Sequence, residues 1–286
     1  MKTVEITYRY GAQDTRSRPT DSDAAQKRLE AGNLAFRALL DGLANDNGTT
    51  QCVINVDLQD LGLMEGKNRG PKQRPFAAVL GCSDARVPIE LIFNEGPNDL
   101  FVIRVAGNGL GSEVLGSLKY AVEHLGGSIK VVAVLGHSGC GAVSSAVDAY
   151  LEPSRYLALT TSHSLREILD RLLVVIQASA KRIQDVFGPE ITSFAGYRTA
   201  LIETSIAINA ALAAHTLQKE LESSRADEIR AVYGVYLLET RQVWAPRRGT
   251  AVWTGLADPP GHPADFIELA NALLYSDRIA SLLQAD

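Results

Sequence analysis

The chain has 286 residues, of which 46% are hydrophobic and 21% are charged, a composition typical of a globular protein with a buried core. Its net charge of −5, from 28 basic and 33 acidic residues, argues against a nucleic-acid or anionic-membrane partner, because both require a basic surface. No apolar run approaches the roughly 20 residues that span a bilayer, and the first residues contain no apolar segment of a secretory signal. Three cysteines are too few for a disulfide framework. We therefore expect a cytoplasmic, reduced protein that binds neither nucleic acid nor a membrane.

The N-terminal quarter of the chain is polar at first and then helical. Residues 1–20 are turn-rich and are predicted to form a polar arm. From Asp21 onward, apolar residues recur every three or four positions, which predicts a long helix. Residues 44–75 are predicted to be mostly loop, interrupted by a short apolar stretch at Cys52–Val56.

Three short, continuous apolar runs follow at 76–81, 100–105 and 130–136. Such runs are typical of strands that are buried on both faces of a sheet. Helical stretches lie between them, at 87–94 and 112–125. Because the strands alternate with helices, the sequence predicts an α/β fold with a central, mainly parallel β-sheet flanked by helices.

The remainder of the chain continues this pattern without a repeat or a low-complexity tract. Its predicted elements are two long helices at about 164–187 and 197–222, a strand at 229–238 and a last helix at about 263–284. We predict a single α/β domain over residues 21–286, in which about 150–196 form a longer helical segment.

Two of the predicted strands end in chemically reactive residues. The first is followed by Cys82, Asp84 and Arg86, and the third by His137 and Cys140. Carboxyl ends of parallel strands meet at one edge of a sheet, where ligands bind, so two thiols and an imidazole are expected to lie close together. Cysteine and histidine are preferred zinc ligands, and three protein ligands leave a fourth position open for water, which is the catalytic arrangement.

Two interpretations of this spacing remain open on the residues alone. The residues form a metal site, or two small cysteines and a histidine simply pack at strand ends. Asp84 and Arg86 favour the metal site, because residues two positions apart can pair and hold a charged group in a fixed orientation beside the metal.

The segment from about Gln73 to Val143 resembles the β-class carbonic anhydrases. The resemblance is carried by the strings GCSDARVPIELIF, FVIRVAGN, GSLKYAVEHLG and VVAVLGHSGCGAV, and above all by CxDxR combined with HxxC. It implies a β-carbonic-anhydrase-like fold with an N-terminal helical arm. It further implies zinc-dependent, reversible hydration of carbon dioxide to bicarbonate and a proton by zinc-bound hydroxide.

The resemblance also assigns roles to individual residues. It implies one Zn²⁺ per chain, bound by Cys82, His137 and Cys140, with Asp84 and Arg86 as the catalytic pair. The substrate pocket would be formed by Gln73, Phe101, Tyr120 and the backbone N–H of Gly141. In the family this pocket lies at a dimer interface, so a homodimer or a dimer of dimers is expected, with CO2 and bicarbonate as the small-molecule partners.

Other motifs point elsewhere more weakly. GNGLGSE at 107–113 approaches a dinucleotide-binding loop, but Ser112 stands where GxGxxG requires glycine. The turns around Ser83 and Ser138 approach a serine-hydrolase GxSxG motif, but both lack its final glycine. Two alternatives stay open: a hydrolase of carbon disulfide or carbonyl sulfide on the same scaffold, and a non-catalytic binding or assembly homologue. The complete set of ligands and charged residues argues against the second.

Overall fold

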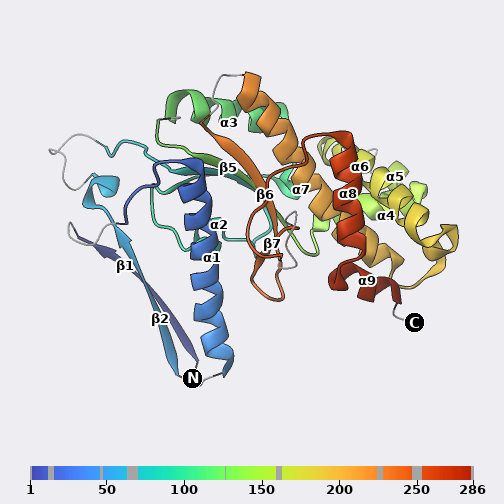
Figure 1. The fold of residues 1–286 in the computed structure, drawn as a ribbon, viewed down its shortest axis with the longest axis horizontal. Helices are drawn as coiled ribbons and strands as arrows, with labels where there is room; N and C mark the ends of the chain where they lie inside the picture. The colour runs from blue at the N-terminus through green and yellow to red at the C-terminus, as the bar shows by residue number, and fades with distance from the viewer. Residues whose placement is uncertain are drawn as a thin grey trace.

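A five-stranded sheet forms the centre of the computed structural model (Figure 1). The structure describes residues 2–11, 16–45, 48–62, 70–125, 127–158, 163–223, 228–246 and 253–284. The strand order is β4-β3-β5-β6-β7, in which all neighbours are parallel except the last pair. The strands are β3 (Ala77–Gly81), β4 (Leu100–Arg104), β5 (Val131–His137), β6 (Arg230–Tyr236) and β7 (Val243–Trp244). The predicted α/β fold with a mainly parallel sheet is confirmed.

Helices cover both faces of this sheet. They are α1 (Ser22–Asn45), α2 (Ile89–Ile92), α3 (Ser112–Leu125), α4 (Gly141–Leu151), α5 (Pro153–Ala158), α6 (His163–Phe187), α7 (Tyr197–Ser223), α8 (Pro263–Leu274) and α9 (Asp277–Gln284). Short 3-10 helices span Leu58–Leu61, Ala106–Asn108 and Pro189–Ser193. The helix predicted at 87–94 is a single turn. The one predicted at 263–284 is interrupted at Tyr275 and Ser276, which separates α8 from α9.

The apolar strands are buried on both sides because they contribute to two cores. Along β3, Ala78 and Leu80 pack into the larger core with α3, α4 and the helices from α6 to α9. Ala77 and Val79 point the other way, into a smaller core with α1 and α2. Alternate residues of a strand face opposite sides of a sheet, which explains why these strands appear as continuous apolar runs in the sequence.

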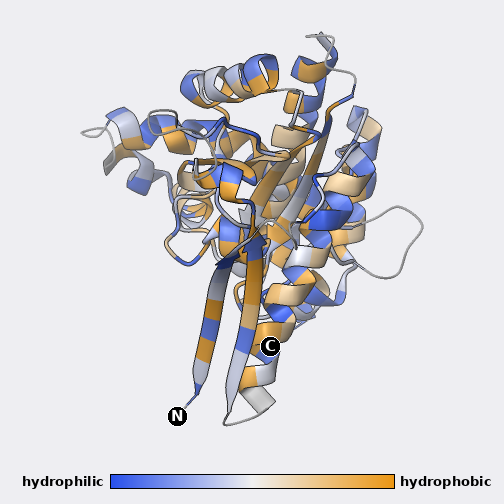
Figure 2. Cartoon of the chain, turned by 90° about the vertical axis from the view of Figure 1, so that its left-hand side faces the viewer, coloured by the Kyte–Doolittle hydropathy of each residue, from blue (hydrophilic) through white to orange (hydrophobic). Residues whose placement is uncertain are grey.

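The polar arm predicted for residues 1–20 contains a strand that the sequence analysis missed. β1 (Thr3–Tyr10) pairs in parallel with β2 (Thr49–Val56), which is longer than the predicted stretch 52–56. The two strands form a narrow ribbon that extends from the body beside α1 (Figures 1 and 2). Polar and apolar residues alternate along β1, as expected of a strand with one face covered. Each residue of β1 pairs with the residue 46 positions later in the chain, so no hairpin turn marks the pairing.

Helix α7 is the central helix of the larger core. In the part of the chain that the structure describes, it is the one helix long and apolar enough to cross a membrane, yet 72% of its most apolar window is buried inside the protein. It packs against β5 and β6. Its apolar surface is therefore used within the fold.

Candidate metal centre at the carboxyl ends of the sheet

The structure brings together the three side chains that the sequence singled out as metal ligands. Cys82 follows β3, His137 ends β5 and Cys140 immediately precedes α4. β3 and β5 are paired in parallel, so their carboxyl ends lie side by side. All three side chains are buried, and their ligand atoms lie within 4.8 Å of one another.

The donor atoms fit a zinc ion. The sulfur atoms of Cys82 and Cys140 are 3.9 Å apart, close to the separation of about 3.8 Å that two Zn–S bonds of about 2.3 Å subtend in a tetrahedral site. His137 Nδ1 donates to the carbonyl oxygen of Ser138 at 3.0 Å. This leaves the lone pair on Nε2, which is buried and has no hydrogen-bond partner in the described chain. A buried imidazole nitrogen without a partner is costly, and a metal ion between the three side chains would satisfy it.

Each cysteine affects the ionisation of the other. A hydrogen bond from the Cys140 thiol, whose sulfur lies 3.9 Å away, lowers the pKa of the Cys82 thiol below its usual range. The contact with ionised Cys82, together with burial, raises the pKa of Cys140. The negative charge on one sulfur therefore disfavours ionisation of the other, and a cation would be needed to keep both sulfurs ionised.

Asp84 and Arg86 form a two-pronged ion pair beside these ligands. Arg86 donates from Nε to Asp84 Oδ1 at 3.0 Å and from Nη2 to Oδ2 at 2.7 Å. These bonds hold the pKa of the Asp84 carboxyl well below its usual range. The same Oδ2 lies 3.8 Å from Nε2 of His137. An ionised carboxylate therefore stands next to the ligand group with both oxygens occupied by Arg86.

The loop that contains Cys82 has an additional support from the neighbouring strand. Arg104, the last residue of β4, donates from Nε to the Cys82 carbonyl at 3.0 Å and from Nη2 to the Asp84 carbonyl at 2.5 Å. No motif in the sequence indicates this role for Arg104. Its position at the carboxyl end of a predicted strand is the one feature of the sequence that could have indicated a place near the site.

The loop between His137 and Cys140 is held by residues that sequence analysis missed. Gly139, at φ +62°, donates its N–H to Glu203 Oε1 of α7 at 2.9 Å. Ser138 Oγ donates to Glu239 Oε2 at 2.9 Å and accepts the N–H of Leu238 at the same distance. A glutamate on a long helix and another beyond β6 carry no motif, so only the fold reveals their proximity.

Arg278 of α9 joins these two glutamates. It donates from Nη2 to Glu203 Oε2 at 2.6 Å, and its Nη1 contacts Glu239 Oε1. The glutamates raise the pKa of Arg278 against the effect of burial. The C-terminal helix is thereby connected to the ligand loop.

The four predicted pocket residues are spread over the chain. Gln73 is exposed in the segment before β3, and Gly141 is the exposed first residue of α4, directly after Cys140. Phe101 lies on the edge strand β4 and is paired with Ala78 of β3. Ala78 precedes Cys82 by four residues, so Phe101 lies roughly 13 Å from the level of Cys82 along the strand direction. Tyr120 is half exposed on α3, with its ring stacked on His124. Gly141, which directly follows Cys140, is the one of these four residues that neighbours a candidate metal ligand in the sequence.

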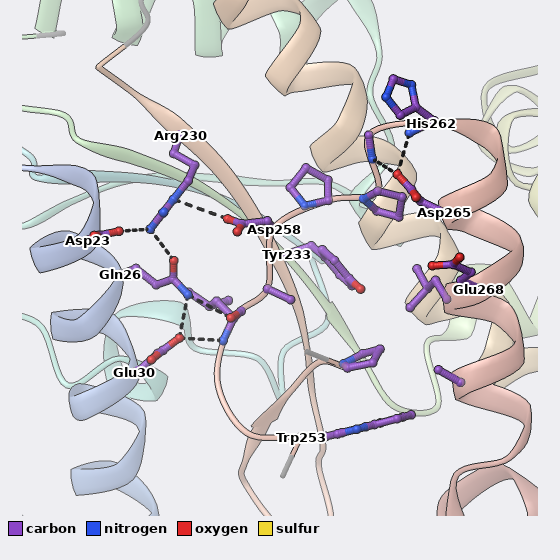
Figure 3. Close-up of a pocket in the computed structure, with 18 of the residues that line it drawn as sticks. Asp23, Gln26, Glu30, Arg230, Tyr233, Trp253, Asp258, His262, Asp265 and Glu268 are labelled. Atoms are coloured by element: carbon purple, nitrogen blue, oxygen red, sulfur yellow. Dashed lines mark hydrogen bonds and ion pairs between the residues drawn. The ribbon is translucent and has the colours of Figure 1, made fainter. Parts of the chain in front are cut away.

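A large cavity of about 1060 Å³ lies elsewhere, between α1, α8 and the amino end of β6 (Figure 3). Its lining includes Arg230, Tyr233 and Trp253. Arg230 begins β6 and is paired with Val131 at the start of β5, whereas His137 ends β5. The cavity and the ligand group therefore lie toward opposite ends of the parallel strands.

Comparisons with known proteins agree on one family. A family model described as carbonic anhydrase matches residues 77–237, more than half of the chain. Carbonic anhydrase 2 of Mycobacterium tuberculosis is 48% identical over 130 residues, which are 46% of this chain and 55% of that protein. The carbonic anhydrase of Mycolicibacterium smegmatis is 41% identical over 100 residues, 35% of this chain and 45% of that protein.

The chain thus spans about half the length of the curated relatives that it matches. Among solved structures, the β-carbonic anhydrase CcaA has 21% sequence identity and a TM-score of 0.48, with 82% of this chain and 96% of that one covered. On the strength of the family model, which includes both ligand loops, this chain belongs to the β-carbonic anhydrase family.

Proposed function

We propose that the protein is a zinc-dependent carbonic anhydrase, which catalyses the reversible hydration of carbon dioxide to bicarbonate and a proton. The observation that carries this proposal is the convergence of Cys82, His137 and Cys140, with the Asp84–Arg86 pair beside them. Membership of the carbonic anhydrase family supports it. Neither half of the sequence motif would carry the same weight alone.

Zinc held by Cys82, His137 and Cys140 would supply a Lewis acid that makes water nucleophilic near neutral pH. Asp84 is ionised and can accept a hydrogen bond from the attacking water, which orients that water toward the carbon of CO2. Arg86 engages both oxygens of Asp84. This contact keeps the carboxylate from turning inward and taking the position that the water needs.

The pocket and the assembly belong to the same proposal. Gln73 and Tyr120 are accessible on the surface of the single chain, as side chains that face a neighbouring subunit would be. We propose that they and Phe101 complete the substrate pocket in a homodimer or a dimer of dimers. Gly141 would contribute its backbone N–H from within the same chain.

The test combines metal analysis with a rate measurement on one preparation. We expect the preparation to contain about one zinc per chain, and we expect the same sample to hydrate CO2 in a stopped-flow assay. Cys140→Ser should lose both, because serine is a poor zinc ligand. Full hydration by a protein without metal would refute the proposal. Turnover of carbon disulfide or carbonyl sulfide, with none of CO2, would instead favour a related hydrolase.

A further inference from the structure

One peptide group links a carboxylate on α7 to the candidate ligand His137. The carbonyl oxygen of Ser138 accepts the hydrogen bond from His137 Nδ1 at 3.0 Å. The N–H on the other side of this peptide belongs to Gly139 and donates to Glu203 Oε1 at 2.9 Å. The imidazole and the carboxylate therefore bind opposite ends of the same peptide dipole.

This arrangement has a defined electrostatic effect. A carboxylate that accepts the N–H polarises the peptide and makes its carbonyl oxygen a stronger acceptor. A stronger acceptor at Nδ1 fixes the tautomer of the imidazole and its orientation, and increases the basicity of Nε2. Glu203 can thus influence the atom of His137 that would bind the metal without touching it.

Glu203 is itself held in place. Its side chain is 10% exposed, and its second oxygen accepts a hydrogen bond from Arg278 Nη2 at 2.6 Å. Arg278 also contacts Glu239, which accepts the hydroxyl hydrogen of Ser138. The two glutamates that bind Ser138 and Gly139 are therefore both in contact with the guanidinium of Arg278 on α9.

The position of α9 is fixed by close packing. Ile279 and Leu283 are 1% and 4% exposed and belong to the larger core. A Cβ atom added to Gly196 would lie 1.6 Å from the carbonyl oxygen of Leu282. The backbones at Gly196 and Leu282 are therefore so close that only glycine fits at position 196. This packing fixes α9, and with it the position of Arg278.

We propose that Glu203 and Arg278 are positioning residues for His137, acting through the Ser138–Gly139 peptide, and that α9 thereby controls how tightly the centre retains zinc. This inference rests on the proposed function for the identity of the metal. It extends that function by assigning metal retention to residues of α7 and α9, outside the CxDxR and HxxC segments.

The first measurement is the rate at which the purified holoprotein releases zinc to an excess of chelator at constant pH. Glu203→Gln keeps an oxygen that can accept the Gly139 N–H but removes the charge. Mutation of a residue that supports a metal ligand in this way typically reduces metal affinity by about 10–100-fold, so we expect release to accelerate by about tenfold or more. Arg278→Met should act in the same direction, and Arg278→Lys should restore part of the retention.

The matched control is Arg198→Met. Arg198 also lies on α7 and forms a two-pronged pair, with Asp148 of α4, at 2.6 and 3.0 Å. Within the described residues it makes no hydrogen bond or ion pair with the ligand loop, so zinc release should remain at the parental rate even if the melting temperature falls. If Arg198→Met accelerated zinc release as much as Glu203→Gln does, the effect would be a consequence of lower protein stability, and the proposal would be overturned.

A second readout does not depend on bound metal. In metal-free protein labelled with ¹⁵N-histidine, the ring shifts of His137 should report a proton on Nδ1 in the parent and a lower population of this tautomer in Glu203→Gln. Unchanged shifts together with an unchanged zinc release rate would overturn the proposal. If the parent bound no zinc, the proposed function would fail, whereas the tautomer measurement would still decide whether Glu203 acts on His137.

Discussion

The loop after β3 and the loop after β5 present ligands at the same edge of the sheet, but different parts of the chain hold them. In the first loop, Asp84 is paired with Arg86 only two residues away. The remaining support comes from Arg104 on the adjacent strand. The first loop is therefore organised mostly by residues of the motif and its immediate neighbour.

The second loop depends on distant residues. Gly139 binds Glu203 on α7, Ser138 binds Glu239 after β6, and Arg278 near the C-terminus joins both glutamates. The difference indicates a division of tasks: the first loop provides the ionised group that faces the reaction, and the second orients a ligand. Variants of the Asp84–Arg86 pair should change turnover, and variants of the residues that support the second loop should change metal retention.

Asp84→Asn should give the largest separation between turnover and metal content. Asparagine preserves the size of the side chain but removes the charged acceptor, so we expect kcat/KM for CO2 hydration to fall by about 100-fold or more. Zinc content should stay at the parental level. Asp148→Asn is the matched control, because Asp148 is also paired with an arginine, and it should leave kcat/KM unchanged. An Asp84→Asn enzyme with full zinc and parental kcat/KM would make Asp84 a structural partner of Arg86 only.

Arg86→Ala should have the next largest effect. Its bonds are the main reason that the pKa of Asp84 is low, and they also hold the carboxylate in place. Without them we expect kcat/KM near neutral pH to fall by about 10-fold or more, the size of one lost charge-assisted hydrogen bond. The measurement is kcat/KM against pH, with zinc content determined at each point. A profile that coincides with that of the parent would contradict this role.

Gly196→Ala tests the second loop from a distance. The added methyl group would collide with the backbone of Leu282, so α9 must shift, at a cost of roughly 1–3 kcal/mol in the free energy of unfolding. We expect a lower melting temperature and faster zinc release. Gly116→Ala on α3 is the control, since a Cβ there would meet no atom of the described residues within 4 Å. Faster release in the control as well would remove the link between α9 and the loop.

The smallest effect concerns a carboxylate outside both loops. Glu95 is fully buried, and burial raises its pKa to about 7 despite its contact with Arg28. A raised pKa in the folded state means that folding favours the protonated form. The stability contribution of this group therefore decreases as pH rises from about 4.5 to about 7.

Glu95→Gln should remove this pH dependence. The free energy of unfolding of the variant relative to the parent should increase steadily across that pH range, as measured by urea denaturation. A constant difference between the two proteins would show that Glu95 is ionised throughout. Neither result should change zinc release, because Glu95 contacts neither ligand loop in the described structure.

The sequence predicted the features that depend on local pattern. Continuous apolar runs predicted the parallel strands, and the ends of two of them predicted that Cys82, His137 and Cys140 would meet. Pairing of Asp84 with Arg86 also followed from their spacing. In each case the relevant residues are neighbours in sequence or occupy equivalent ends of parallel strands.

Features that depend on long-range packing were missed. Strand β1 pairs with β2 across an intervening helix, with no turn to mark the pairing. Glu203 and Arg278 lie on amphipathic or apolar helices, where a single charged residue is ordinarily taken as surface. Their roles arise from the close contact between Gly196 and Leu282, which fixes α9, and no local pattern reports that contact.

The most direct test of the proposed zinc carbonic anhydrase is reconstitution of metal-free protein while CO2 hydration is followed. We expect that activity rises in proportion to added zinc and reaches its plateau at about one zinc per chain. Cys140→Ser should remain inactive throughout the titration. Full activity before zinc is added, or no activity once Cys82, His137 and Cys140 are shown to hold the metal, would contradict the proposal.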